Sequence, residues 1–269
     1  MSTVSFSLSP KTMLNIFKRF SVAPTVSSPV IETLSMRVLA NEGLKVVQAD
    51  DVQSMVVYAY VNKDYFNIWR CGVDKVLTFD AAEVLKSLDR FFKKSVTVEF
   101  KLENNIIRLV DESNAFVEIE NRADDFSLEE GLIDVDENGI AVPINVDKEE
   151  PREKLFHVIV PVDKLSSVIN VLSGKAKDEF ISIRFDKNGI FLYFEKGLNK
   201  YGKPVIADVQ YKAEDTEKVE VSIPIKYFKS VAKILEGNVD MIITEGNILT
   251  ISLRSSAFYY NYIIMPAVE

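Results

Sequence analysis

Lysine and arginine side chains recur on one side of several short helical segments, and this pattern is the one most able to support a binding function. Between residues 225 and 235, three lysines face away from apolar residues that recur at helical spacing. Residues 80–94 and 10–20 repeat the arrangement. Because the cations are separated and few aromatic residues lie between them, they suit contacts to phosphate groups without reading of bases. The candidate contacts are Lys11, Lys18, Arg19, Lys86, Arg90, Lys93, Lys226, Lys229 and Lys233.

The helical segment at residues 163–174 departs from this pattern. Its outer face carries Ser166, Ser167 and Asn170, and its nearest cations are Lys164, Lys175 and Lys177. A net charge of −8 taken alone argues against binding to nucleic acid, because phosphate contacts need concentrated Lys and Arg. A single cationic helix face is usually a solvated surface. Three such faces in a chain of net negative charge favour a binding role for these cations.

Residues able to support catalysis are few. His157 is the only histidine and lies in an apolar strand, which favours a half-buried structural role, and Cys71 is the only cysteine. A nucleophile triad that uses histidine and a cysteine-rich zinc site are therefore poorly supported. Residues 134–139 match the start of a calcium-binding loop, but Asn145 stands where the closing Glu is needed and no helices flank the segment. We expect a polar turn there, no cofactor, no metal and no enzymatic activity.

The helical segments belong to a repeated unit, a short helix followed by a β-hairpin. The unit occurs four times, with a tight polar turn in each hairpin, at residues 10–48, 80–110, 163–194 and 225–254. Two pairs of repeats predict an α+β protein of two similar domains. An acidic, non-periodic segment separates them, so we expect domains at 1–122 and 155–269 with a connector at 123–154.

Length and composition agree with two domains. Nearly half of the 269 residues are apolar, which is enough for two cores. No apolar run is long enough to span a bilayer, and the first residues lack the pattern of a signal peptide. With one cysteine, the chain is expected to be intracellular, in the nucleus or the cytoplasm depending on its source.

The repeat order and several segments resemble the PCNA-type DNA sliding clamps (the proliferating cell nuclear antigen family) of archaea, eukaryotes and viruses. The resemblance covers nearly the whole chain and rests on the order of the motifs, since no one motif is diagnostic. The similar segments are GLKVVQADDVQSMVVYAYV at 43–61, YFNIWRC at 65–71, LIDVDENGIAVP at 132–143 and IIMPAVE at 263–269. Two features depart from the family: the cation-poor third helix, and Met265 in place of a small residue before Pro266.

The resemblance implies a DNA-clamp fold in which sheets lie outside and helices line a ring around duplex DNA. The ring would have three subunits, identical or different, and would act without enzymatic activity as a polymerase processivity factor. Its implied partners are DNA polymerase, a clamp loader, ligase and nucleases. A checkpoint-type clamp, one subunit of a heterotrimeric ring, or an enzyme that uses the repeat as a scaffold are the alternatives.

The resemblance also implies two protein-binding surfaces. The β-prone segments at 115–120 and 204–211 would pair between neighbouring subunits, through Ala115, Val117, Ile119, Val205, Ala207 and Val209. Short peptides of partner enzymes would bind under the connector. The residues implied for that pocket are Val52, Gln53, Leu132, Ile133, Ile140, Val142, Pro143, Met265 and Pro266. From the residues alone, the apolar positions of the connector could equally serve to hold it against the sheet.

Overall fold

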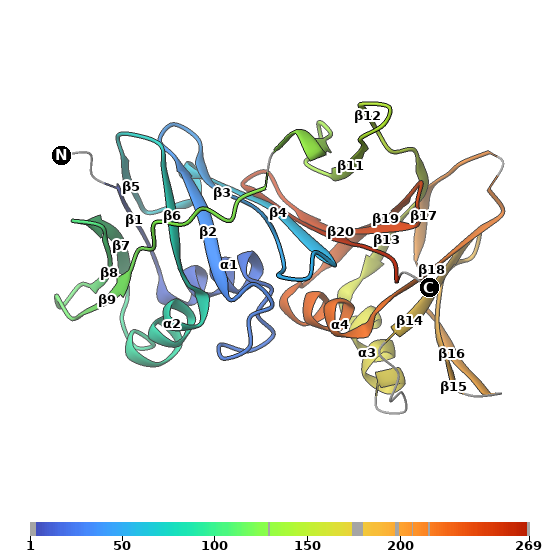
Figure 1. The fold of residues 1–269 in the computed structure, drawn as a ribbon. Helices are drawn as coiled ribbons and strands as arrows, with labels where there is room; N and C mark the ends of the chain where they lie inside the picture. Colours follow the sequence, from blue (N-terminus) through green and yellow to red (C-terminus); the bar gives the residue numbers. More distant parts are fainter. Residues whose placement is uncertain are drawn as a thin grey trace. The chain divides into compact units, whose positions relative to one another are not determined.

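The computed structural model describes residues 4–128, 130–173, 180–196, 199–205, 207–214 and 216–267. The chain forms two compact units (Figure 1), and neither is one uninterrupted half of the sequence. Unit 1 comprises Met1–Asp51, Val57–Leu128 and Ser255–Tyr260. Unit 2 comprises Val52–Val56, Glu129–Arg254 and Asn261–Glu269. None of the helices described is long and apolar enough to cross a membrane.

Unit 1 contains two sets of antiparallel strands and two α-helices. One sheet has the strand order β5-β1-β7-β8-β9, and the other set runs β4-β3-β2-β6. The elements, in chain order, are β1 Val4–Leu8, α1 Pro10–Phe20, β2 Thr33–Leu39, β3 Gly43–Ala49, β4 Met55–Asn62, η1 Lys63–Tyr65, β5 Ile68–Cys71, β6 Lys75–Asp80, α2 Ala81–Lys86, the π-helical turn η2 Ser87–Phe91, β7 Val98–Glu103, β8 Ile106–Asp111 and β9 Phe116–Glu120.

The core of unit 1 is aromatic and lies between the helices and the sheets. Phe6 stacks on Phe100 with ring centroids 4.7 Å apart, and Phe17 of α1 lies 5.8 Å from Phe100. Both helices begin at residues that can cap them. The Ser9 hydroxyl accepts a hydrogen bond from the Thr12 N–H, and the carboxylate of Asp80 accepts one from the Glu83 N–H. The helices therefore start where the sequence supplies an oxygen for unpaired N–H groups.

Unit 2 repeats this architecture and adds the connector. Its strands run in the orders β17-β13-β19-β20-β21, β16-β15-β14-β18 and β10-β11-β12. The elements are η3 Glu130–Leu132, β10 Ile133–Val135, β11 Ala141–Asn145, β12 Glu150–Pro151, β13 Lys154–Pro161, α3 Val162–Ser173, β14 Phe180–Asp186, β15 Gly189–Lys196, β16 Asn199–Val205, β17 Asp208–Lys212, β18 Lys218–Pro224, α4 Ile225–Ile234, β19 Asn238–Thr244, β20 Ile248–Arg254 and β21 Phe258–Ile264.

The four predicted helix–hairpin repeats are present, so the predicted α+β fold class is confirmed. Their turns use residues that tolerate a positive φ angle. Asn104 and Asn105 have φ angles of 49° and 63° between β7 and β8. Gly43, at 148°, cannot be replaced: a Cβ atom there would lie 2.0 Å from the carbonyl oxygen of Val61.

The segment predicted as a connector, 123–154, is more ordered than its acidic composition suggests. Its first part follows unit 1, where the Phe126 N–H donates to the Ser35 hydroxyl and the Leu128 N–H donates to the Val47 carbonyl. Its second part forms the three short strands β10, β11 and β12 of unit 2. These strands were not predicted, because each has at most five residues and their alternation is interrupted by turns.

The prediction that the β-prone segment at 204–211 forms one strand was wrong. Strand β16 ends at Val205 and strand β17 begins at Asp208, and the two strands belong to different sheets. Val205 is buried, and Val209 pairs in register with Val158 of β13. The run of β-prone residues therefore contributes to two strands of different sheets, which periodicity over eight residues cannot distinguish from one strand.

Candidate functional site

In unit 1, α1 and α2 lie side by side (Figure 1). Most of the predicted contact residues on and just after these helices are exposed. Lys86 of α2, together with Arg90 and Lys93 that follow it, is exposed, as is Lys11 at the start of α1. Lys18 is half-buried. The opposite side of α2 is anchored in the core, as predicted, by Leu85, Leu88 and Phe92, each at most 1% exposed. The π-helical turn also leaves Phe91 57% exposed beside these cations.

Arg19 does not share this exposure. It is 8% exposed, and its guanidinium carbon lies 5.2 Å from the ring centroid of Tyr260 and 5.8 Å from that of Phe258. Burial raises the pKa of Tyr260, while the nearby Arg19 charge acts in the opposite direction. The Arg19 guanidinium packs against aromatic rings within unit 1. The prediction that Arg19 contacts phosphate is therefore wrong for this structure, because the side chain is buried.

In unit 2, α4 presents two exposed cations, whereas the only cation in the sequence of α3 is Lys164. Lys226 and Lys233 are exposed and Lys229 is half-buried, while Phe228 and Val231 fill the core side. The Ser166 hydroxyl of α3 donates to the carbonyl of Ala232 in α4, 3.0 Å away. The outer serine of α3 thus joins the helices together. Exposed Lys164 remains, while Lys175 and Lys177 lie outside the described residues.

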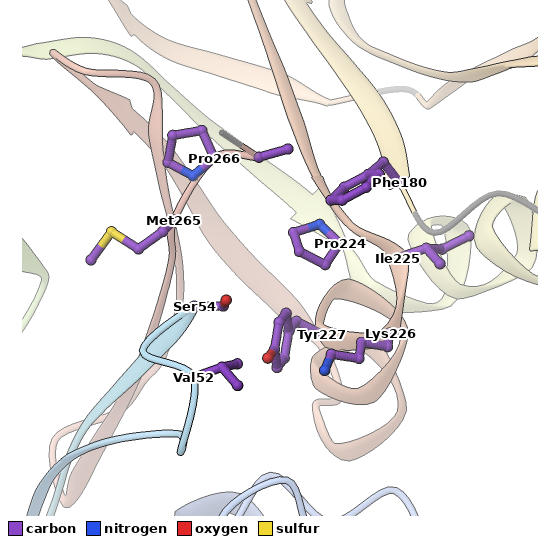
Figure 2. Close-up of a pocket in the computed structure, with 10 residues that line it drawn as sticks. Val52, Ser54, Phe180, Pro224, Ile225, Lys226, Tyr227, Met265 and Pro266 are labelled. Carbon is purple, nitrogen blue, oxygen red and sulfur yellow. The ribbon is translucent and has the colours of Figure 1, made fainter. Parts of the chain in front are cut away.

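A pocket of about 610 Å³ in unit 2 brings together three residues that the sequence placed in one site: Val52, Met265 and Pro266 (Figure 2). Residues 265–267, called the tail below, are held by two backbone hydrogen bonds. The Met265 N–H donates to the Ser54 carbonyl and the Ala267 N–H donates to the Ser222 carbonyl. Gln53, which has a φ angle of 54°, is exposed and is not among the lining residues. The other lining residues are Ser54, Phe180, Pro224, Ile225, Lys226, Tyr227 and Ala267.

The far wall of this pocket comes from residues that sequence analysis did not select. Phe180 begins β14 and pairs in register with Pro224, the last residue of β18. Pro224 is the N-cap residue of α4, and Tyr227 lies in the first turn of this helix. A proline at the junction of a strand and a helix was a visible signal for this corner. Phe180 carried no comparable signal, because its position depends on the pairing of β14 with β18.

The apolar residues of the connector serve mainly to hold it in unit 2. Ile140 and Val142 are 2% and 3% exposed, and Pro143 is also buried. These three are therefore not available to a ligand in this structure, and they do not line the pocket described above. Leu132, which is 44% exposed, and half-buried Ile133 remain accessible. Of the two interpretations left open by the sequence, attachment to the sheet describes Ile140 and Val142.

Polar contacts fix the turn of the connector. The Ala141 N–H donates to Asn261 Oδ1 over 3.1 Å, and Asn261 Nδ2 donates to the Gly139 carbonyl over 2.9 Å. Asp136 accepts from the N–H groups of Asn138 and Ile140 and from Lys154 Nζ. Within the described residues, no group of three or more His, Cys, Asp or Glu side chains could hold a metal ion. The calcium-like sequence is a capped polar turn.

His157 is half-buried and belongs to a polar cluster around the buried carboxylate of Asp240. Its Nε2 lies 2.8 Å from Asp240 Oδ1, and Arg254 donates to the same carboxylate from Nε over 3.0 Å. Burial opposes ionisation of Asp240, but the hydrogen bonds from His157 and Arg254 hold the pKa of this carboxyl below its usual value. Arg254 also reaches the Asn138 carbonyl. The group links β13, β19, β20 and the connector, which agrees with a structural role for the histidine.

Among the described residues, β9 and β16 are end strands of their sheets, and these two strands carry opposite charge. β9 carries Glu118 and Glu120, and β16 carries Lys200 and Lys203, so their net charges are −2 and +2. Of the predicted interface residues on β9, Ile119 is buried opposite Ile107, and Val117 and the preceding Ala115 are half-buried. Ala207 and Val209, predicted for the second edge, lie beyond β16.

No family model matches this sequence, and no curated protein matches it. Solved structures match it along its whole length. The crystal structure of proliferating cellular nuclear antigen (PCNA) from Entamoeba histolytica aligns with a TM-score of 0.75 at 13% identity, covering 100% of both chains. The PCNA2–PCNA3 complex from Sulfolobus tokodaii aligns with a TM-score of 0.73 at 10% identity, covering 99% of this chain and 100% of that chain.

These similarities define the class of protein: the chain has the fold of the DNA clamps. More particularly, the fold is of the PCNA type, as the sequence resemblance implied. At 10–13% identity the likeness establishes the fold and does not by itself transfer a partner or a site.

Proposed function

We propose that this protein is a sliding clamp that encircles duplex DNA and keeps replication or repair enzymes on it. The observation that carries the proposal is the placement of charge: a chain of net charge −8 presents exposed cations on α1, α2 and α4, and its helices otherwise pack into the core. Such separated cations suit phosphate contacts that are independent of sequence. A ring needs only weak contacts of this kind, because encirclement prevents loss while the absence of base contacts permits sliding.

Assembly of the ring is proposed to use the two charged edges. The end strand of a sheet has unpaired N–H and C=O groups that can bind another strand. Pairing of β9 in one copy with β16 in the next would satisfy both edges and place acidic residues near basic ones. Exposed Phe116 of β9 and Tyr201 of β16 would lose water-exposed apolar surface in the same contact. A head-to-tail contact of this type generates a closed ring when its rotation closes.

The charges favour a ring of identical chains. β17, the other edge near the predicted interface, carries Asp208 and Lys212 and has no net charge, whereas β16 matches the acidic edge of its own chain. A heterotrimeric ring remains the alternative, in which each edge would meet a different chain. The resemblance to PCNA-type clamps suggests three subunits.

Partner enzymes, including a polymerase, a ligase, nucleases and a clamp loader, are proposed to bind through short segments at the pocket formed by the 52–54 segment, α4 and the tail. Its volume of about 610 Å³ is in the range of ligand sites, and Val52 and Phe180 expose 65% and 42% of their surface there. Exposed apolar residues around a hollow commonly mark a protein-binding surface. Leu132 of the connector is a further accessible apolar residue.

Topological retention on DNA tests the proposal. The protein is incubated at low salt with nicked circular duplex DNA, the salt is raised, and retention is compared before and after the circle is cut. A clamp should stay on the circle at high salt and be lost after cutting. Ordinary phosphate binding instead weakens about 10³- to 10⁵-fold between 50 and 200 mM salt regardless of DNA topology. Equal release from both DNA forms would contradict encirclement.

A further inference from the structure

Lys226 differs from the other helix cations because it lines the pocket proposed above to bind partner enzymes, which we call the partner pocket (Figure 2). Its ammonium lies 4.5 Å from the ring centroid of the neighbouring Tyr227. It is the only charged residue among the described residues that line the pocket. The structure gives Lys226 no salt-bridge partner among the residues that it describes, and the side chain is exposed.

The rest of the pocket is largely apolar. Val52 and Met265 lie on one side and Phe180 and Ile225 on the other, with Tyr227 between them (Figure 2). An apolar side chain that enters this space would be removed from water by both walls. Ser54 and the tyrosine are the other polar contributors. A ligand for this pocket therefore needs an apolar group, and the cation beside it adds a second requirement.

The start of α4 favours the same sign of charge in the ligand. The N-cap residue of the helix is Pro224, and no side chain caps the helix there. Ile225, Lys226 and Tyr227 form the first turn, and all three line the pocket. The N-terminus of a helix carries partial positive charge, so it attracts anionic groups and repels cations. The dipole and the lysine thus act together, whereas the net charge of −8 would disfavour an acidic ligand elsewhere.

We propose that this pocket binds a partner segment in which an apolar side chain is followed or preceded by a carboxylate, and that Lys226 recognises the carboxylate. The inference rests on the proposed function, in which partner segments bind at this pocket, and it specifies their chemistry. Lys226 would then contribute to partner selection, while Lys229 and Lys233 on the same helix belong to the DNA-contact set.

Calorimetric titration with matched peptides tests this assignment. The probes are short peptides that carry Leu and Phe in an otherwise neutral sequence, each made with Glu or with Gln at one flanking position. The wild-type protein should bind the best Glu peptide about two- to fivefold more tightly than its Gln match, as expected for one exposed ion pair. Lys226→Met keeps most of the apolar stem and should abolish this preference. Lys226→Arg and the control Lys229→Met should retain it.

A variant of the apolar wall separates the two proposals. Phe180→Ala removes a side chain that is 42% exposed, so the fold should survive, which thermal unfolding can verify. If Phe180→Ala weakens both peptides but the wild type binds Glu and Gln peptides equally, the pocket stands and the role of Lys226 is refuted. A preference for Glu that persists in Lys226→Met refutes it as well. Absence of any binding that depends on Phe180 contradicts both the carboxylate assignment and the partner pocket.

Discussion

Reversing the charge of strand β9 should disrupt self-assembly while leaving the folded monomer intact. The perturbation is Glu118→Lys with Glu120→Lys. Glu118 is 51% exposed in its side chain, and its salt bridge to Arg108 spans 3.7 Å, so its loss should change monomer stability by less than about 1 kcal/mol. Its neighbour Glu120 is exposed as well. The effect of the double change should therefore appear in assembly rather than in folding.

The magnitude follows from the number of charge pairs. Pairing of β9 with β16 would set two carboxylates against Lys200 and Lys203. An exposed ion pair contributes about 0.2–1 kcal/mol, and reversal replaces each attraction with a repulsion of similar size. Two reversed pairs thus amount to about 1–4 kcal/mol per contact, which is about 5- to 1,000-fold in the dissociation constant. Lys200 of β16 also contacts Tyr193, with its ammonium 3.5 Å from the ring centroid. Because this contact competes with an ion pair to β9, we expect a change in the lower half of this range.

Sedimentation velocity over a range of protein concentrations measures the effect. The β9 variant should shift from the assembled species to the monomer, and Lys200→Glu with Lys203→Glu should do the same. All four changes in one chain exchange the signs of the two edges and should restore assembly. Glu103→Lys is the matched control, because Glu103 also pairs with Arg108 but lies on an interior strand. Unchanged assembly in both double variants, or no recovery in a normally folded fourfold variant, would refute pairing of these edges.

Three further changes test other parts of the structure. Lys229→Glu with Lys233→Glu should lower the slope of log affinity for DNA against log salt by about one unit per lysine that contacts a phosphate, measured by fluorescence anisotropy; an unchanged slope removes them from the contact set. Arg19→Ala should destabilise unit 1 by about 1–3 kcal/mol in urea unfolding and leave that slope unchanged, because its charge is stacked on buried rings. Asp240 has a lowered pKa when folded, so its stabilisation is present above about pH 4 and is lost as pH falls further. Asp240→Asn should therefore be less stable at pH 7, with a shallower loss of stability between about pH 4 and pH 2; an equally steep loss would show that other carboxyls control the acid transition.

The fold was predictable because its signals are local and repeated. Helices α1 and α2 combine apolar spacing with a capping residue, Ser9 and Asp80, and each hairpin has a turn residue that accepts a positive φ angle. Agreement among four repeats compensates for the weakness of each signal alone. The separation of β16 from β17 was not predicted, because a change of sheet leaves the alternation of apolar residues intact.

The candidate site was predictable only in part, since exposure depends on tertiary packing. Lys11, Lys86 and Arg19 have similar helical contexts in the sequence, yet Arg19 is buried against rings more than two hundred residues away along the chain. Ile140 likewise reads as an accessible apolar residue in an acidic segment, although Asn261 draws its turn onto β21. Such long-range contacts have no signature in a local pattern.

Asn261 gives the connector a dynamic character distinct from that of the sheet beneath it. One side-chain amide supplies two of the hydrogen bonds that anchor the turn, to the Ala141 N–H and to the Gly139 carbonyl. The amide of Ala141 can then exchange its hydrogen with solvent through a local opening that breaks these two bonds, whereas amides in the ladder between β19 and β20 exchange only through wider unfolding. The connector is thus a separate unit of local stability, to which this buried asparagine contributes two anchoring contacts.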